Sequence, residues 1–166
     1  MKQTKLTARQ IRDFLPRIPF NLVLGVKLTR VHFDGVTIEC ALRHELTNSA
    51  GVAHGGVAAA MADVAVGIAI NRHFGGKRKI TTVEMKINYF RPASEGSRIF
   101  ARARLLRLGS TLGVGSVDLT DTNRNLIGAA LVTYIFLEAR GTGRLLSWIP
   151  LSAKRVHHAG AGNRKS

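Results

Sequence analysis

The sequence has little of several features that point to particular functions. It contains one cysteine, Cys40, so a disulfide framework within the chain is impossible and a reducing compartment is expected. Aromatic residues make up 6% of its 166 residues, too few for a platform that stacks single-stranded nucleic acid. The N-terminus lacks the long apolar core of a signal peptide. Together with the length, these features predict a cytoplasmic protein of one domain.

Acidic residues are also scarce, since 10 Asp and Glu stand against 25 Lys and Arg, for a net charge of +15. Such a charge attracts polyanions, including nucleic acids. The cations are scattered over both ends and the expected strands, however, without a recognition helix or zinc-ligand spacing. A phosphate-bearing small molecule such as coenzyme A suits the same charge, so we expect no specific nucleic-acid partner. The basic first thirty residues, with Asp13 as their one acid, would also suit an organelle-targeting segment.

No apolar run is long enough for a clear membrane span. The longest, from Gly55 to Ile70, is short and carries Asp63 in its middle. This segment is apolar on every side, which predicts a helix buried all round rather than a helix at the surface. We therefore expect no membrane partner.

Strand-like segments flank this helix. Alternating or continuous apolar residues predict strands at 22–31, 36–42, 80–90, 98–108, 113–121 and 126–137. A mainly antiparallel sheet wrapped around the helix satisfies this order, because the helix needs apolar partners on most of its circumference. The sequence therefore predicts an α+β domain at 21–140, with a basic arm containing a helical turn at 1–20 and a basic tail at 141–166.

Two features of the helix could carry chemistry. Asp63 is its only ionisable residue before Ile70, and a buried carboxylate is costly unless it is paired, hydrogen-bonded or functional. On this feature alone, a structural and a catalytic role are about equally supported. At the start of the helix, His54-Gly55-Gly56 offers unpaired N–H groups at the positive end of the helix dipole. Such a site can stabilise a carbonyl oxygen that develops negative charge.

These two features are too far apart to act on one substrate within one chain. Gly55 and Asp63 are eight residues apart, which corresponds to about 12 Å along a helix axis. A catalytic carboxylate and an oxyanion donor must both lie within about 3 Å of the reacting centre. Two such helices, antiparallel about a two-fold axis, could bring them together. The chemistry therefore predicts a homo-oligomer with sites shared between chains.

Three motifs occur in the order and spacing of a known family: Asn48-x-x-Gly51-x-x-His54-Gly55-Gly56, then Asp63, then Thr82-x-Glu84-x-x-Ile87-x-Tyr89-x-Arg91-Pro92-Ala93. Over roughly residues 20–138, the chain resembles the PaaI-type hotdog thioesterases. The resemblance implies an α+β hotdog fold, with a six-stranded antiparallel sheet around one long helix. It also implies dimers, usually paired into homotetramers, that hydrolyse acyl-CoA without a metal or redox cofactor.

The resemblance further implies roles for individual residues. Asp63 would be the nucleophile or general base, and Thr82 would lie beside it and assist the water. The Gly55 N–H would polarise the thioester carbonyl, and Asn48 of the same chain would hold the water or the carbonyl. His54 would shape the loop or take a direct part in proton transfer.

Substrate contacts are expected at Gly56 and Arg91, where Arg91 would meet a CoA phosphate or else remain solvated at the strand end. One departure concerns Ser110, which stands after Gly109 where family members often have Arg or Lys. This departure weakens the case for a CoA contact there. No metal is expected, because His157-His158 has no third ligand nearby.

Two rival functions keep the same fold. A hotdog hydratase or dehydratase would pair a catalytic His with an acid at a different spacing from that of His54-Gly55-Gly56. A non-catalytic acyl-CoA sensor would keep the pocket but lack Asp63 or its partners. A nucleic-acid-binding module is the alternative that the sequence supports least. The acyl group stays open between aryl-acetyl, benzoyl-type and medium-chain fatty substrates.

Overall fold

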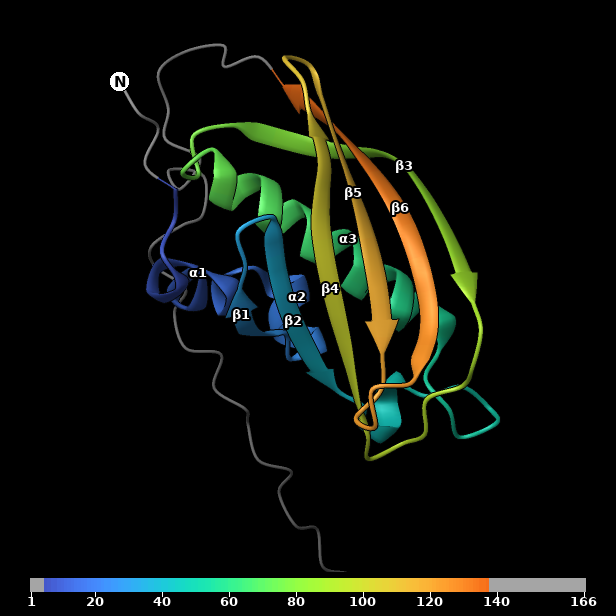
Figure 1. The fold of residues 1–166 in the computed structure, drawn as a ribbon. Helices are drawn as coiled ribbons and strands as arrows, with labels where there is room; N and C mark the ends of the chain where they lie inside the picture. Colours follow the sequence, from blue (N-terminus) through green and yellow to red (C-terminus); the bar gives the residue numbers. More distant parts are fainter. Residues whose placement is uncertain (1–4, 138–166) are drawn as a thin grey trace, which may run out of the picture.

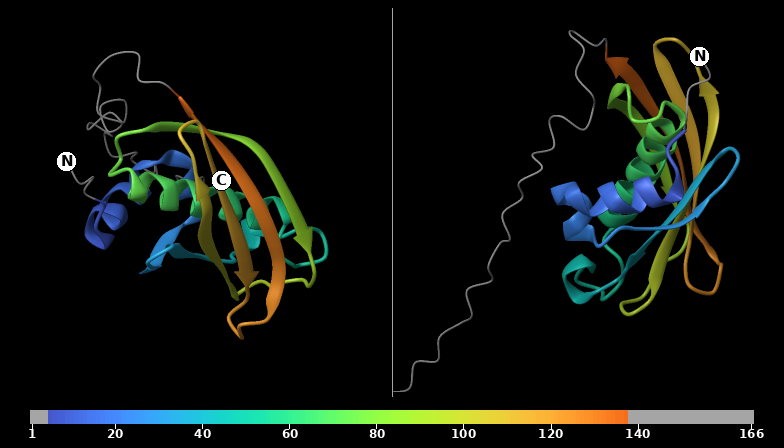
Figure 2. Two further views of the ribbon diagram at one scale, coloured as in Figure 1. Left: turned by 45° about the horizontal axis from the view of Figure 1, so that its top comes forward. Right: turned by 90° about the vertical axis from the view of Figure 1, so that its left-hand side faces the viewer.

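The computed structural model describes residues 5–137 as one curved sheet around a long helix (Figure 1). The helix α3 (Gly55–His73) lies in the concave face of the sheet, as both views of Figure 2 show. Six antiparallel strands follow one another in the spatial order β1-β2-β4-β5-β6-β3. Their bounds are β1 (Lys27–Val31), β2 (Gly35–Ala41), β3 (Lys79–Tyr89), β4 (Arg98–Leu108), β5 (Leu112–Thr120) and β6 (Leu126–Leu137). The expected α+β hotdog fold is confirmed.

The sheet packs tightly on α3 because alternate residues of its central strands face inward. Along β5, Gly113, Gly115, Val117 and Leu119 are buried, while the residues between them are half-buried. A Cβ atom at Gly115 would lie 2.9 Å from Cγ1 of Val66 on α3. The absence of a side chain at this position therefore lets the helix approach the sheet closely.

The helix α3 differs from the expectation in one respect. It is apolar on all sides, and Met61, Ala62 and Val66 are fully buried. However, a stripe along its other side is covered incompletely within one chain: Gly56 is exposed, and Ala59, Ala60, Asp63 and Val64 are half-buried. This stripe ends at Val64, and every residue from 65 to 70 is buried. The first half of the helix is thus buried on one side only, and the second half is buried all round as expected. By length and composition α3 could also cross a membrane, but a mostly buried core helix gives the same pattern.

The N-terminal part also departs from the prediction. The expected strand at 22–31 begins only at Lys27, because Pro19–Leu24 forms the helix α2. Pro19 occupies the first helical position, and Gly25 ends the helix with φ of 71°, a left-handed conformation that favours glycine. Before it, α1 (Ala8–Phe14) is longer than the expected helical turn.

The segment expected as a basic arm contributes to the core. The side chains of Ile11 and Leu15 are 0% and 1% exposed. Both belong to the same cluster of buried residues as α3 and the sheet. The division at residue 20 stays a prediction, and the expected tail at 141–166 lies outside the described residues.

Candidate active site

Asp63, Thr82 and Tyr134 form a hydrogen-bonded group between α3 and the sheet. The Thr82 hydroxyl donates to Oδ1 of Asp63 at 2.7 Å, and the Tyr134 hydroxyl lies 2.8 Å from the same oxygen. Thr82 on β3 and Tyr134 on β6 are partners in the antiparallel register, so the sheet brings both side by side beneath the helix. The other carboxylate oxygen of Asp63, Oδ2, accepts no hydrogen bond from residues 5–137.

This arrangement holds one end of the carboxylate and leaves the other end open. Asp63 is half-buried, on the stripe of α3 that the chain itself does not cover. Two hydroxyl groups at Oδ1 fix the orientation of the side chain, because each bond restricts its rotation. A carboxylate held in this way can attack an electrophile or accept a proton from water through Oδ2.

Tyr134 remains a proton donor over the physiological pH range. Burial raises the pKa of its hydroxyl far above the usual value, and the negative charge of Asp63 raises this pKa further. The same hydroxyl also lies 2.9 Å from the backbone carbonyl oxygen of Asp63. The phenol therefore bridges the side chain and the backbone of one residue.

Space for this hydroxyl depends on Gly67, one turn further along α3. A Cβ atom at Gly67 would lie 2.8 Å from the Tyr134 hydroxyl oxygen, closer than real Cβ atoms approach other atoms. The glycine therefore permits the contact between Tyr134 and Asp63.

The loop before α3 is fixed by side chains that were predicted as site residues. Asn48 Oδ1 accepts hydrogen bonds from the backbone N–H groups of Ala50 at 2.9 Å and Val52 at 3.4 Å. His54 Nδ1 accepts from the N–H of Gly56 at 3.0 Å and caps the helix. This bond requires an unprotonated Nδ1, so the proton of a neutral His54 ring lies on Nε2.

The two glycines at the helix start are therefore not equivalent. The N–H of Gly56 is occupied by His54. Within residues 5–137 the N–H of Gly55 has no acceptor, while the Gly55 carbonyl accepts from the Tyr89 hydroxyl at 3.1 Å. Gly55 can thus offer its N–H group, with the positive end of the α3 dipole, to a carbonyl oxygen.

The structure brings together some of the predicted residues but not all of them. Thr82 meets Asp63, as described above. Gly55 starts α3, eight residues before Asp63, which means about 12 Å along the helix axis. His54 is the N-cap residue and Asn48 lies in the loop before it. Arg91 donates from Nη1 to the carbonyl of Leu126 at 2.8 Å and lies near the start of α3, not near Asp63.

Sequence reasoning missed Tyr134. It lies in β6, within the segment that the sequence predicts as a strand at 126–137. It is nevertheless the only ionisable side chain in that strand, and this is the same signal that singled out Asp63 in its helix.

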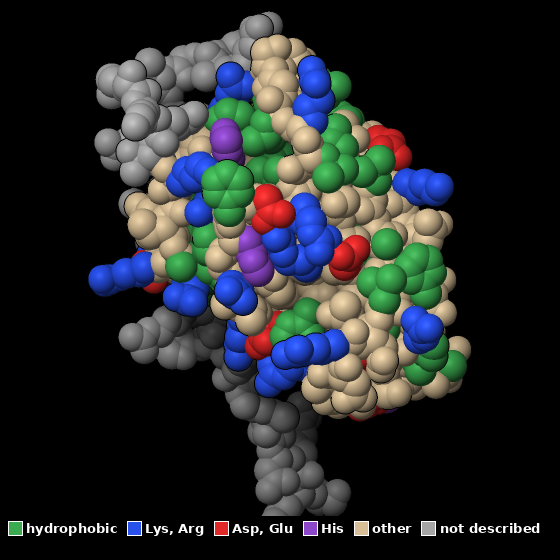
Figure 3. Space-filling model, in the orientation of Figure 1, with side chains coloured by type: hydrophobic (Ala, Val, Ile, Leu, Met, Phe, Trp, Pro, Cys, Tyr) green, Lys and Arg blue, Asp and Glu red, His purple; other side chains and the backbone are tan. Residues whose placement is uncertain are grey.

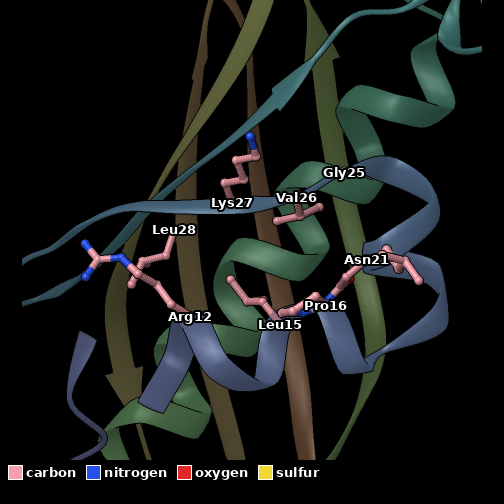
Figure 4. Close-up of a pocket in the computed structure, with 9 residues that line it drawn as sticks. Arg12, Leu15, Pro16, Asn21, Gly25, Val26, Lys27 and Leu28 are labelled. Atoms are coloured by element: carbon pink, nitrogen blue, oxygen red, sulfur yellow. The ribbon is translucent and has the colours of Figure 1, made fainter. Parts of the chain in front are cut away.

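Two cavities lie in different parts of the domain. The larger, about 480 Å³, is lined by α1, α2 and β1, with Leu15, Asn21 and Val26 in its wall (Figure 4). It contains none of the predicted site residues. The smaller, about 330 Å³, has Gly55 in its wall and is bordered by the end of β3. Of these two cavities, only the smaller has in its wall a residue that is predicted to act in catalysis, Gly55.

Charge is distributed without one continuous basic surface on the face in Figure 3, where acidic side chains lie among the cations. Arg104 pairs with Asp118 at 2.6 Å, Arg98 pairs with Glu39 at 2.6 Å, and Arg102 pairs with Asp34. Within residues 5–137, no group of three or more His, Cys, Asp or Glu could hold a metal ion. His157-His158 lies outside the described residues.

Comparison with known proteins gives consistent similarities. Residues 50–127 match the family described as the thioesterase superfamily. Acyl-coenzyme A thioesterase 13 of Mus musculus is 31% identical over 115 residues, which cover 68% of this chain and 81% of that protein. The medium/long-chain acyl-CoA thioesterase YigI of Salmonella typhimurium is 29% identical over 139 residues, covering 74% and 88%.

Solved structures agree with these sequence matches. Zebra fish thioesterase superfamily member 2 has a TM-score of 0.73 at 28% identity, covering 80% of this chain and 99% of that one. A mutant of the phenylacetic acid degradation protein PaaI from Thermus thermophilus has a TM-score of 0.65 at 26% identity, covering 72% and 99%.

Proposed function

The chain belongs to the thioesterase superfamily and is a thioester hydrolase of the PaaI-like hotdog type, and from this premise we propose how it acts and on what. The substrate is an acyl-CoA or aryl-CoA thioester, which is hydrolysed to the free acid and CoA. Asp63 is the nucleophile or general base, and the Gly55 N–H is the oxyanion donor. The thioesterases that resemble this chain and act on acyl-CoA support this choice of substrate.

One observation carries the proposal: Oδ1 of Asp63 is held by Thr82 and Tyr134, while Oδ2 is left open. A carboxylate that only anchored the helix would be expected to use both oxygens in hydrogen bonds. Here one oxygen is open, on the stripe of α3 that the chain itself leaves uncovered. A reacting carboxylate requires one.

The reaction needs only water and these groups. Either Oδ2 attacks the thioester carbonyl carbon and water then hydrolyses the resulting anhydride, or Oδ2 takes a proton from water while the water oxygen attacks. In both routes the carbonyl oxygen becomes negative, and the Gly55 N–H stabilises it. The C–S bond breaks, the thiolate of CoA leaves and is protonated, and the acid is released. Asn48 holds the water or the carbonyl, and Thr82 assists the water.

Each site uses two chains. The distance of about 12 Å between Gly55 and Asp63 is too large for one carbonyl to meet both within a single α3. The uncovered stripe of α3 offers a surface for a second α3. At the sheet edge, β3 leaves Val83 and Tyr89 52% and 55% exposed, as expected of a strand that another chain covers. We expect dimers formed by these surfaces, and tetramers built from them.

The remaining predicted residues take supporting roles. His54 holds the helix start through its bond to Gly56, and a direct proton transfer would use Nε2. Gly56 contacts substrate through its bare Cα, since its N–H is occupied. Arg91 lies beside the cavity at Gly55, where its charge suits a CoA phosphate. The net charge of +15 suits the same ligand in a cytoplasmic enzyme.

The test is release of free thiol from a panel of acyl-CoA thioesters, compared between the wild-type protein and Asp63→Asn. The variant keeps the size of the side chain and both hydroxyl contacts but loses the carboxylate. We expect kcat to fall by a factor of at least about 100, with an unchanged circular dichroism spectrum. Near wild-type hydrolysis by a folded Asp63→Asn protein would make Asp63 structural and end this mechanism.

A further inference from the structure

The larger cavity, of about 480 Å³, has no part in the reaction proposed above. It lies between the N-terminal helices and the first strand, with walls from α1, the turn after it, α2 and β1 (Figure 4). None of the residues assigned to catalysis or to substrate contact lines it. What it can bind is therefore decided by its own walls.

Most of the wall is apolar. Leu15, Val26 and Leu28 are 1%, 6% and 7% exposed, and their side chains present only carbon atoms. Leu22 lines the same cavity from α2 and is 64% exposed. An apolar chain in this cavity would cover Leu22 and would remove apolar surface from water on both partners. The cavity therefore suits a ligand with an apolar body.

Asn21 is the exception in this apolar wall. It is the only buried side chain in residues 5–137 that carries an amide or a charge, and it is 4% exposed. Its backbone carbonyl accepts from the N–H of Val26 at 3.0 Å, but its side-chain amide makes no hydrogen bond with any described residue. A buried amide is costly without a partner. Because Asn21 lines the cavity, a hydroxyl or carbonyl oxygen of a bound molecule could supply that partner.

The charged residues of the wall are all basic. Arg12 lines the cavity from α1, is exposed, and forms no ion pair with the described residues. Lys27 adds a second cation, and no Asp or Glu of the described chain is among the lining residues. Figure 4 places Arg12 and Asn21 on opposite sides of the cavity. A ligand that fills the space between them would have an anionic group at Arg12 and a hydrogen-bonding oxygen at Asn21.

We propose that this cavity is a second ligand site, separate from the thioester site, and that it binds an oxygenated fatty acid. The ligand has a carboxylate at Arg12, an apolar chain along Leu15, Val26 and Leu28, and a hydroxyl or carbonyl oxygen at Asn21. The volume is roughly sixteen times the ~30 Å³ that one water occupies in the liquid, which gives room for on the order of fifteen non-hydrogen atoms. This site goes beyond the proposed function and does not depend on it.

Calorimetric titration of the wild-type protein with 10-hydroxydecanoate and decanoate gives the first test. The two acids have the same chain length and charge and differ by one hydroxyl. We expect the Kd of the hydroxy acid to be about three- to tenfold lower, because its hydroxyl provides the partner that Asn21 lacks. Equal affinities, tighter binding of decanoate, or binding of neither acid would overturn the proposal.

Asn21→Leu tests the contact with the hydroxyl. This variant keeps the approximate size of the side chain and removes the amide. Decanoate should then bind more tightly than 10-hydroxydecanoate, because the hydroxyl would be buried against carbon atoms. The midpoint of thermal unfolding should not fall, since the amide that is removed has no partner in the protein. A folded Asn21→Leu protein that still prefers the hydroxy acid would overturn the assignment of Asn21.

Arg12→Gln tests the contact with the carboxylate, and Arg107→Gln is its matched control. Both variants lose one positive charge, but Arg107 is an exposed residue of β4 that does not line the cavity. At an ionic strength of about 0.15 M, both acids should bind about three- to tenfold more weakly to Arg12→Gln. Their affinities for Arg107→Gln should equal those for the wild type. Equal losses in the two variants would show an effect of net charge alone and would overturn the placement of the carboxylate.

Val26→Phe separates this cavity from the thioester site. The larger ring occupies the space between α2 and β1, so the affinity for both acids should fall by at least about tenfold. Thiol release from acyl-CoA should be unchanged, and Asp63→Asn should bind both acids as the wild type does. A folded Val26→Phe protein with wild-type affinity would place the acids elsewhere and overturn the proposal. If the wild type binds the hydroxy acid but cleaves no acyl-CoA, the proposed function fails and this site remains.

Discussion

The hydroxyl of Tyr134 lies 2.8 Å from Oδ1 of Asp63 and 2.9 Å from the backbone carbonyl oxygen of the same residue. A phenol on the strand β6 thus contacts both the side chain and the main chain of the proposed catalytic residue. Because its single proton can go to the carboxylate, Tyr134 can orient the side chain of Asp63.

Tyr134→Phe should therefore slow the reaction without weakening substrate binding. Removing one hydrogen bond to a charged group costs about 1.5–3 kcal/mol, which corresponds to a roughly 10- to 100-fold lower kcat if the bond orients Asp63 in the transition state. KM should change little, because the hydroxyl faces Asp63. Steady-state kinetics of the folded variant measure both values. An unchanged kcat would show that Thr82 alone suffices to hold the carboxylate.

The same hydroxyl should make the protein sensitive to alkaline pH. Burial, followed by the charge of Asp63, raises the pKa of Tyr134 in the folded state above the value of about 10 in the unfolded chain. Its contribution to stability is therefore complete below about pH 10 and is lost above it, where the unfolded state releases a proton that the folded state retains. The added slope approaches about 1.36 kcal/mol per pH unit.

Urea unfolding at several pH values between about 8 and 11 should reveal this difference. Above about pH 10 the free energy of unfolding should fall more steeply for the wild type than for Tyr134→Phe. All other ionisable groups are the same in both proteins, so their contributions cancel in the comparison. Parallel curves would mean that the Tyr134 hydroxyl is not protected in the folded state.

Gly67→Ala should interfere with the same contact from the helix side. Its Cβ would lie 2.8 Å from the Tyr134 hydroxyl oxygen, so either the phenol or the helix must move, at a cost of about 1–3 kcal/mol in unfolding free energy. Activity should fall together with stability, because Asp63 loses its support.

In a Tyr134→Phe background the same change should do far less harm. The hydroxyl oxygen is then absent, and the nearest ring carbon lies 3.3 Å from the added Cβ. Alanine also stabilises a helix interior by up to about 1 kcal/mol relative to glycine. The double variant should therefore be about as stable as Tyr134→Phe alone. Additive losses in thermal unfolding would show that the clash is with something other than the hydroxyl.

The sheet could be predicted from the sequence because its strands alternate or form apolar runs bounded by turns. The segment 22–31 was misassigned for a specific reason: the residues of α2 are mostly apolar, and a short apolar run has no period that separates helix from strand. Pro19 and Gly25, the residues that delimit α2, were the available signals.

The site shows a similar limit. Asp63 stood out because a lone carboxylate in an apolar helix is costly, and Thr82 followed from a family motif. Tyr134 acts only through the pairing of β6 with β3, in which it lies opposite Thr82. That register joins residues about fifty positions apart, so no local pattern reveals it.

The distance along α3 supports a test of the shared site by mixing two inactive proteins. If each site takes Gly55 and Asn48 from one chain and Asp63 and Thr82 from the other, a dimer of one Asn48 variant and one Asp63 variant has one doubly damaged site and one intact site. Mixed dimers should recover up to about half the wild-type activity per dimer, although both parents are impaired.

The choice of variant matters at Asn48, because its Oδ1 holds the loop through Ala50 and Val52. Asn48→Asp keeps an oxygen for these two N–H groups, while it removes the side-chain amide donor and adds a negative charge. Paired with Asp63→Asn, it damages each function while preserving the surrounding backbone.

Two different affinity tags on the parent proteins allow the mixed dimer to be isolated after co-refolding, and untreated mixtures of the parents give the background. Verified mixed dimers as inactive as their parents would place the whole site within one chain. Within one chain, Gly55 and Asp63 are about 12 Å apart, too far for one substrate carbonyl to contact both. That result would therefore also exclude Gly55 as the oxyanion donor in the reaction of Asp63.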